Sequence, residues 1–315
     1  MRLAADHVRV RVPATSANLG PGFDALGVAL SLHDELEVRA VGSPGATVEV
    51  SGEGAGQVPD DEKHLVVRAV RLALDHVGAS QVGLHLVCRN RIPHGRGLGS
   101  SAAAVVAGIL AARGLIAEPD ALDDQTCLAL ATQMEGHPDN AAPALLGGAT
   151  VAWSDGTQVR AARLPVHPDL VPVAVVPPQH LSTRTARSVL PAQVPHADAA
   201  FEAGRAALLV EALGRRPDLL LPATEDRMHQ EYRRTVMPDS LALVGALRRQ
   251  GLAAVVSGAG PTVLVLARRT GEATTDADAA VAAAFGGVMA GWRVLTLPID
   301  LVGAVGEPVR AGLRP

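Results

Sequence analysis

"IPHGRGLGSSAAAVVAG" (residues 92–108) packs four glycines and two adjacent serines directly before an alanine-rich helical pattern. Glycines let a backbone approach a ligand closely, and the start of a helix carries several N–H groups without an internal partner. The helix dipole adds partial positive charge there, which favours an anion such as phosphate. The stretch therefore predicts a phosphate-binding loop; a loop that is only a tight connection stays an alternative.

Alternating and helical patterns organise the first half of the chain around this loop. Apolar residues at every second position predict strands, and apolar residues three or four apart predict helices. The first strand is expected to end at Pro13, because proline has no N–H to donate to a sheet. The expected strands are 8–12, 34–41, 46–50, 82–88 and 147–153, and the expected helices contain the face of Val66, Val70, Ala73 and Val77 and then residues 100–115 and 121–134.

The second half follows a different order, which begins after Pro165. Strand, helix, strand, strand, helix and strand succeed one another, as in a split βαβ, ferredoxin-like unit. The intervening polar and proline-containing stretch, 154–168, is expected to hold a domain boundary. We therefore predict an α+β fold with two domains, 1–160 and 161–315. The expected elements of the second are 171–176, 197–213, 252–257, 261–267, 276–286 and 292–297.

Composition limits the partners of the chain. With a net charge of −4, no basic run and 2% aromatic residues, its 315 residues lack the usual features of a nucleic-acid surface. Cys88 and Cys127 are too few for a disulfide framework or a four-cysteine zinc site. The N-terminus alternates like a strand and not like a signal peptide, and the apolar run 101–112 is too short to span a bilayer. We expect a cytoplasmic protein with neither nucleic-acid nor membrane partners.

Three common cofactor sites fit this sequence poorly. Lys63 is the only lysine, so the chain lacks the lysine of a Walker A loop and one placed to hold pyridoxal phosphate; it is expected in the solvated first turn of a helix. "GLGSSA" (97–102) satisfies the dinucleotide pattern G-x-G-x-x-A, but that motif must directly follow a strand. Here a long, proline-containing connection follows the strand at 82–88, which leaves a dehydrogenase as a weaker alternative.

Two further segments carry turn chemistry that is ordinary when each is taken alone. They are "PATSANLGPGFDALG" (13–27) and "SGAGPTV" (257–263). Together with "PHGRGLGSSAA" they resemble, in order and spacing, the three signature motifs of the GHMP kinases, small-molecule kinases named for galactokinase, homoserine kinase, mevalonate kinase and phosphomevalonate kinase. The resemblance covers essentially the whole chain. It implies an N-terminal domain like ribosomal protein S5 domain 2 and a ferredoxin-like C-terminal domain.

The resemblance also implies that the glycine-rich loop wraps the phosphates of ATP with backbone amides. Glu135, which by itself is typical of a solvated helix end, becomes a ligand for Mg²⁺ together with the Ser100 hydroxyl; Mg²⁺ takes one or two carboxylates plus phosphate oxygens. The residues expected at the nucleotide are Pro93, His94, Gly95, Arg96, Gly97, Leu98, Gly99, Ser100, Ser101, Ala102, Ala103, Ser257, Gly258 and Gly260.

Within the family, three more segments are similar to the homoserine kinase branch. They are "EGHPDNAAPALLGG" (135–148), "LSTRTARSVLP" (181–191) and "DRMHQEYRRTVMP" (226–238). This resemblance implies phosphoryl transfer from ATP to the side-chain hydroxyl of L-homoserine, a step of threonine biosynthesis. It also assigns His137, Asp139 and Asn140, which alone are typical of a turn, to the substrate pocket.

The substrate presents a carboxylate, an ammonium and a hydroxyl. A guanidinium pairs with both carboxylate oxygens, so Arg187 and Arg233 are expected at the carboxylate. Asp24 is then available for the ammonium, Asn18 for the hydroxyl or its neighbours, and Thr183 for the reacting hydroxyl.

The identity of a general base stays open. Positioning and charge neutralisation supply most of the catalysis of phosphoryl transfer, so a protein base is optional. Asp24 is the first candidate and Asp139 the weaker one. Arg248 and Arg249 lie in an amphipathic helical pattern and are expected to face solvent.

Alternatives remain at this point. The phosphate loop does not identify the acceptor, so another GHMP kinase with a mevalonate-type acceptor stays open. A nucleotide-binding protein without catalysis is disfavoured, because the chain keeps Glu135 and both substrate arginines. The sequence does not decide the oligomeric state, and a homodimer stays open.

Overall fold

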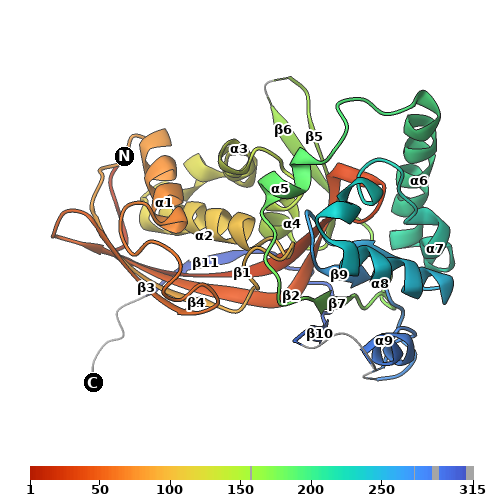
Figure 1. The fold of residues 1–315 in the computed structure, drawn as a ribbon. Coiled ribbons are helices and arrows are strands. Elements are labelled where there is room, and N and C mark those ends of the chain that lie inside the picture. Colours follow the sequence, from red (N-terminus) through yellow and green to blue (C-terminus); the bar gives the residue numbers. More distant parts are fainter. Residues whose placement is uncertain (157, 273, 286–290, 310–315) are drawn as a thin grey trace.

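The computed structural model describes residues 1–156, 158–272, 274–285 and 291–309. Two sheets, each with helices packed against it, lie side by side (Figure 1). Within these ranges no helix combines the length and the apolar character needed to cross a bilayer.

The larger sheet has seven strands in the order β11-β1-β2-β4-β3, with β5 paired to β2 and β6 to β5. All pairs are antiparallel except β3 and β4, which are joined by a helical crossover. Every second residue at the start of β1 is buried, as its alternation predicts. The strands are β1 (His7–Asn18), β2 (Gly22–Val41), β3 (Ala46–Gly52), β4 (Gly83–Asn90), β5 (Ala149–Ser154), β6 (Val159–Leu164) and β11 (Val305–Pro308).

Helices cover one face of this sheet, with α2 at the centre (Figure 1). Helix α2 occupies the predicted range and is buried along most of its length, because alanines let neighbouring elements approach closely. The helices are α1 (Leu65–His76), α2 (Ser100–Leu115), the 3₁₀ turn η1 (Pro119–Leu122), α3 (Asp124–Glu135) and α4 (Ala141–Leu146).

The smaller sheet has the order β10-β7-β9-β8 and is antiparallel throughout. Numbered along the second half, this order is 4-1-3-2, the arrangement of a ferredoxin-like βαββαβ unit, so this prediction is confirmed. Its elements are β7 (Val173–Val176), α5 (Thr183–Ser188), α6 (His196–Gly214), η2 (Pro217–Leu219), α7 (Leu220–Ala223), η3 (Glu231–Thr235), α8 (Pro238–Arg249), β8 (Ala254–Val256), β9 (Val263–Val265), α9 (Asp278–Phe285) and β10 (Arg293–Thr296).

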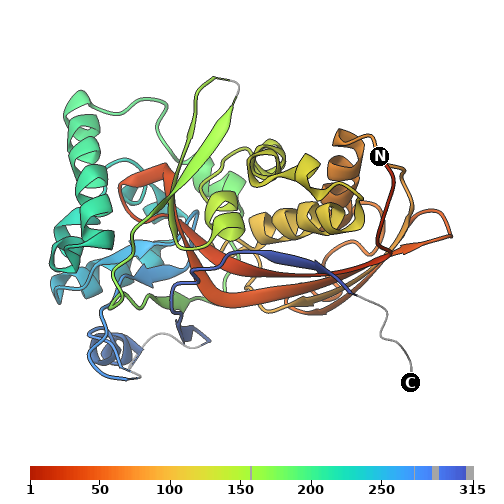
Figure 2. The ribbon, with the colours of Figure 1, turned by 180° about the vertical axis from the view of Figure 1, so that it is seen from behind.

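Three local expectations differ from the structure. Strand β1 continues past Pro13 to Asn18, because a register shift between Pro13 and Ala14 absorbs the missing N–H. Strand β6 occupies part of the polar stretch 154–168 and forms a hairpin with β5. The last described strand, β11, returns from the smaller sheet to pair with β1 (Figure 2). The exact domain boundary stays a prediction, and residue 286 of the expected last helix lies outside the described residues.

The expectation that Arg248 faces solvent is wrong. Its guanidinium donates to the Leu221 carbonyl at 2.7 Å and to the Thr224 hydroxyl at 2.8 Å, and burial lowers its pKa. An amphipathic pattern shows which side chains are polar, but it does not reveal that free carbonyls of another helix need a donor. Arg249 is exposed, as expected.

Two helical glycines provide a matched test of the packing between α1 and α2. A Cβ at Gly108 in α2 would lie 2.6 Å from both Ala69 Cβ and the Val66 carbonyl oxygen, whereas a Cβ at Gly204 in α6 meets nothing within 4 Å. We expect Gly204→Ala to raise the free energy of unfolding by about 0.5–1 kcal/mol. Gly108→Ala should lower it by about 1–3 kcal/mol through overpacking. Urea unfolding of both variants checks this, and stabilisation by both would contradict the close packing.

Candidate functional site

The carbonyl groups of the glycine-rich loop are all held by other parts of the protein. A planar peptide directs its N–H away from its C=O, so this arrangement turns the amides of the loop outward. The held carbonyls of residues 95–98 orient the amides of residues 96–99, and none of the amides from Arg96 to Ala102 donates to a described residue. The loop therefore presents free donors at the start of α2, which suits an anion. The carbonyls of Gly95, Arg96, Gly97 and Leu98 accept from Leu181 N (2.9 Å), Thr262 N (3.2 Å), Ser257 Oγ (2.6 Å) and Thr15 N (3.1 Å).

Ser257 joins the three signature segments. Its side chain is fully buried, and its hydroxyl lies 2.6 Å from the Gly97 carbonyl oxygen and 2.8 Å from Ser16 Oγ. Beside it, Gly258 N donates to the Ala17 carbonyl at 3.0 Å. One hydroxyl from the smaller sheet thus links β1 to the phosphate loop.

Glycine is required at two loop positions by the protein itself. Gly97 and Gly99 have φ of 77° and 69°, in the left-handed region. A Cβ would lie 2.3 Å from the Ser257 carbonyl oxygen at Gly97, and 1.9 Å from Thr15 Oγ1 at Gly99. Both glycines hold the loop against β1 and the third signature segment, and this contact keeps the amides in place.

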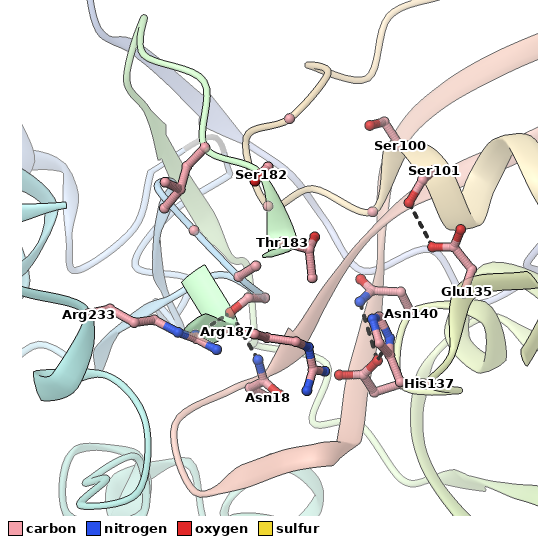
Figure 3. A pocket seen from close by; sticks show the side chains of 18 residues that line it. Asn18, Ser100, Ser101, Glu135, His137, Asn140, Ser182, Thr183, Arg187 and Arg233 are labelled. Carbon is pink, nitrogen blue, oxygen red and sulfur yellow. Dashed lines mark hydrogen bonds and ion pairs between the residues drawn. The ribbon is translucent and has the colours of Figure 1, made fainter. Parts of the chain in front are cut away.

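A cavity of about 230 Å³ opens beside the loop, at the junction of the two halves (Figure 3). In this view Arg187 and Arg233 enter from the second half, and Glu135, His137 and Asn140 face them from the first. The structure brings together these expected residues: Asn18, Gly95, Gly97, Gly99, Ser100, Ser101, Glu135, His137, Asp139, Asn140, Thr183, Arg187, Arg233, Gly258 and Gly260.

Other expected residues do not line this cavity. Leu98, Ala102 and Ala103 are buried in the core, where they anchor the loop and the helix. Arg96 donates instead to the Pro177 and Pro178 carbonyls, each at 3.0 Å. Pro93, His94, Ser257 and Asp24 are also absent from the wall, which gains Leu181, Ser182 and Ala259, three residues that the sequence analysis missed.

Glu135 ends α3 and faces the start of α2. Ser101 Oγ donates to its Oε2 at 2.7 Å, and burial raises the pKa of the carboxyl. The two Mg²⁺ ligands expected from the sequence, Glu135 and Ser100, both line the cavity, and Ser101, which contacts Glu135, lines it as well. In the described part of the chain no group of three His, Cys, Asp or Glu side chains could hold a metal alone. One carboxylate with nearby hydroxyls fits Mg²⁺, which takes its other ligands from phosphates and water.

The segment after α3 supplies a histidine–carboxylate pair. His137 Nδ1 lies 2.8 Å from Asp139 Oδ1, and this hydrogen bond raises the pKa of His137. Asn140 Oδ1 accepts from Thr15 Oγ1 at 2.9 Å, which ties the segment to β1. The segment is therefore part of the pocket wall.

Asp24 and Arg187 form a two-pronged ion pair at the edge of the cavity. Arg187 Nη1 donates to Asp24 Oδ2 at 3.0 Å, Nη2 donates to Oδ1, and the Phe23 ring lies 5.4 Å from the guanidinium carbon. Asn18 Oδ1 accepts from Asp24 N at 3.0 Å, while its amide group donates to the Gly258 carbonyl at 2.9 Å. Asn18 therefore positions Asp24, and the ion pair of Asp24 with Arg187 places opposite charges side by side.

Arg233 is 1% exposed, and its hydrogen bonds join separate segments of the second half of the chain. It donates to the Gly258 carbonyl at 3.0 Å and to the Ala186 carbonyl at 3.3 Å. Burial lowers its pKa to about 10, so the side chain stays cationic at neutral pH. It supplies positive charge to the cavity and holds the helix of Arg187 against the third signature segment.

A second, mostly apolar pocket of about 340 Å³ shares Gly95, Ser100 and Ser101 with the first. Its walls come from β1, β2, β4, α1 and α2, with Val12, Leu36, Val66 and Ala104 among them; His94 also lies here. The sequence analysis missed this pocket, because its residues read as ordinary core positions of separate elements. Their nearness to the glycine-rich loop exists only in the folded chain.

Comparison with known proteins adds an independent result. The model of the GHMP kinases N terminal domain matches residues 64–148, and that of the GHMP kinases C terminal domain matches residues 199–286. The chain belongs to the GHMP kinase family. Kinases of this family use ATP as a substrate, so a nucleotide site is expected at the loop.

This GHMP kinase is similar over most of its length to several curated relatives. It is 55% identical to the homoserine kinase of Streptomyces avermitilis, over 96% of this chain and 97% of that one, and 60% identical to that of Streptomyces coelicolor over 82% and 84%. The crystal structure of homoserine kinase from Cytophaga hutchinsonii matches with a TM-score of 0.82 at 26% identity, over 96% and 98% of the two chains. Leishmania major mevalonate kinase shares the fold, with a TM-score of 0.65.

Replacement of Ser257 tests the link between the signature segments. Ser257→Ala leaves the buried Gly97 carbonyl without its partner, so the loop amides lose their fixed direction. We expect about a tenfold or greater loss of ATP affinity by calorimetry, with a lower melting temperature. Thr132→Ala is the control, because the Thr132 hydroxyl also bonds a carbonyl, that of Leu128 at 2.8 Å, and Thr132 lines neither pocket. Unchanged ATP affinity in Ser257→Ala would remove this link from nucleotide binding.

Proposed function

We propose that this kinase transfers the γ-phosphoryl group of ATP to the side-chain hydroxyl of L-homoserine and releases O-phospho-L-homoserine, a step of threonine biosynthesis. One observation carries the proposal: the loop with free amides and the Arg187 guanidinium, which is paired with Asp24 at the edge of the cavity, line the same cavity. The first feature suits a phosphate chain and the second suits a zwitterionic amino acid. The names of the full-length relatives support the same acceptor.

The nucleotide would span the two pockets. Its base and ribose fit the apolar pocket, and its phosphates lie over the amides from Gly99 to Ala102, where the dipole of α2 adds positive charge. The terminal phosphate would then point into the cavity beside the loop, which Arg187 lines. No lysine lines the cavity beside the loop; Lys63, exposed before α1, lies at the apolar pocket instead.

Glu135, with the hydroxyl of Ser100 or Ser101, would hold Mg²⁺ at the phosphates. When bound, the ion supplies positive charge that neutralises the phosphate oxygens during transfer. Burial raises the pKa of Glu135, and a bound cation lowers it again, so the carboxylate is suited to a ligand that brings positive charge.

The acceptor would be held by complementary charges. Arg187 and Arg233 attract its carboxylate and Asp24 its ammonium, so the substrate enters beside an existing ion pair. His137 and Asn140 line the opposite wall, and the exposed Thr183, in the first turn of α5, reaches the reacting hydroxyl. Positioning against the phosphate supplies the catalysis, while Asp24 and Asp139 remain the two candidates for a base.

A panel of acceptors tests the proposed function. ADP release is measured with Mg²⁺-ATP and homoserine, mevalonate, galactose or shikimate, and phosphorus NMR identifies the product. We expect turnover with homoserine and a phosphate ester at its side-chain hydroxyl. Preference for another acceptor would assign the chain to a different specificity, and ATP binding without transfer to any acceptor would indicate a non-catalytic role.

Both cysteines are free thiols, which fits our proposal that the reaction takes place in the cytoplasm.

Glu135→Gln tests the magnesium site. The amide keeps the size of the side chain but loses its charge, so we expect kcat to fall about 100-fold or more while thermal stability changes little. Glu118→Gln, at an exposed glutamate, is the charge-matched control. Parallel Ser100→Ala and Ser101→Ala variants show which hydroxyl contributes. Normal Mg²⁺-dependent turnover in Glu135→Gln would remove the carboxylate from the site.

Arg187→Leu tests recognition of the substrate carboxylate. Its loss leaves Asp24 facing the substrate carboxylate, and kcat/KM for homoserine should fall by the equivalent of about 2–5 kcal/mol. Homoserinol, which has no carboxylate, should lose its disadvantage relative to homoserine in this variant. Arg184→Leu, at an exposed position of the same helix, is the control. Equal proportional losses on both compounds would show that Arg187 does not recognise the carboxylate.

A further inference from the structure

Asp34 places a carboxylate on the apolar face of the larger sheet. It lies in β2 directly opposite Val12 of β1, and directly opposed residues of an antiparallel pair project to the same face. Leu36, two residues further along β2, and its partner Cys88 lie on that face as well. Asp34 is 8% exposed, and this remaining surface belongs to the apolar pocket beside the glycine-rich loop.

Only one of the two Asp34 carboxylate oxygens accepts hydrogen bonds from the described part of the protein. Oδ1 accepts from Arg91 N at 2.6 Å and from Ile92 N at 2.9 Å, at the start of the connection that leads into the glycine-rich loop. Across the described chain no hydrogen bond to Oδ2 is formed. Oδ2 keeps accessible surface and Asp34 lines the apolar pocket, so a ligand that fills the pocket would take water away from this oxygen. That loss costs free energy unless the ligand brings a donor.

The charge of Asp34 makes it an acceptor. Burial raises its pKa to about 6, against the opposing effect of the two backbone amides, with Glu53 and His33 making smaller contributions of opposite sign. The group is therefore mainly ionised at pH 7.5, where it accepts hydrogen bonds and donates none.

We propose that Asp34 Oδ2 accepts a hydrogen bond from the exocyclic amino group of adenine, and that this contact selects ATP over nucleotides with a 6-oxo base. The inference rests on the proposed function in one respect, the placement of the base in the apolar pocket. It adds a specificity-determining residue outside the signature segments.

The single free oxygen is what favours adenine. A carboxylate recognises guanine best with two oxygens, one for N1–H and one for the 2-amino group, and here Oδ1 is already occupied by two amides. The 6-amino group of adenine needs only one acceptor, whereas the 6-oxo group of guanine or hypoxanthine would bring a second acceptor against the carboxylate and repel it.

Asp34 also has a structural role, which the test must separate from base recognition. Through Oδ1 it fixes the backbone at 91–92, and loss of that contact would disturb the glycine-rich loop and weaken every nucleotide equally. Asp34→Asn keeps an oxygen for the two amides and replaces Oδ2 by a donor. This change should invert the preference for the base and leave the backbone contact in place.

Calorimetry without an acceptor measures the contact directly. Wild type and Asp34→Asn are titrated with the non-hydrolysable imido analogues of ATP, of GTP and of purine riboside triphosphate, whose base has hydrogen in place of the amino group. In wild type we expect the ATP analogue to bind about 10- to 100-fold more tightly than the purine analogue, the range for a hydrogen bond to a charged group. In Asp34→Asn this difference should vanish and the GTP analogue should gain affinity. Glu49→Gln, at an exposed glutamate of β3, controls for loss of charge.

Each outcome decides the proposal. Equal affinity of wild type for the ATP and purine analogues overturns it, and so does a uniform weakening of all three ligands in Asp34→Asn. The wild-type comparison needs no variant, so it decides the question even if Asp34→Asn does not fold. Failure to phosphorylate homoserine would overturn the proposed acceptor but leave this binding result standing, whereas absence of any nucleotide binding would overturn both.

Discussion

The site depends on the way the protein binds the carbonyl groups of one short loop. Because four consecutive carbonyls are held by surrounding backbone and by the Ser257 hydroxyl, the amides that follow are directed away from the protein. A flexible glycine-rich segment would lose much conformational entropy on binding an anion. Here the loop loses this conformational entropy when the protein folds, so its amide donors are already oriented before a ligand binds.

The same contacts explain why both halves of the chain are needed. Thr15 belongs to the larger sheet, whereas Ser257 and Thr262 belong to the segment between two strands of the smaller one, so the loop is fixed only when the two sheets meet. Arg233 strengthens this junction by donating to carbonyls of α5 and of the third signature segment. In the proposed function, phosphate binding and substrate binding would thus share one structural support, and the groups proposed to recognise the substrate are held in register with the loop amides.

The proposed nucleotide site would bind phosphate with little side-chain charge. Its single lysine is exposed, and the arginines at the cavity are engaged with a carboxylate or with carbonyls. Directed amides and the dipole of α2 take the place of a fixed cation, so the net charge at the loop stays low until the ligand and its counter-ion arrive. The charges of Asp24 and Arg187 also neutralise each other, and in the proposed function a zwitterionic substrate would replace part of that contact.

The sequence by itself determined the local elements and the chemistry of the loops. The periodicity of α2 and the ferredoxin-like order of the second half depend on neighbours in sequence, and the signature segments were recognisable as strings, so most residues of the cavity wall were predicted. Tertiary structure alone decided the return of β11 to β1, the hydrogen bonds of Arg248 to the segment 221–224 and the contact of Glu135 with Ser101. It also decided the apolar pocket around Asp34, whose walls come from five separate elements. These features arise from contacts between residues far apart in the chain, and such contacts leave no periodic signal because each partner satisfies its own local pattern equally well without the other.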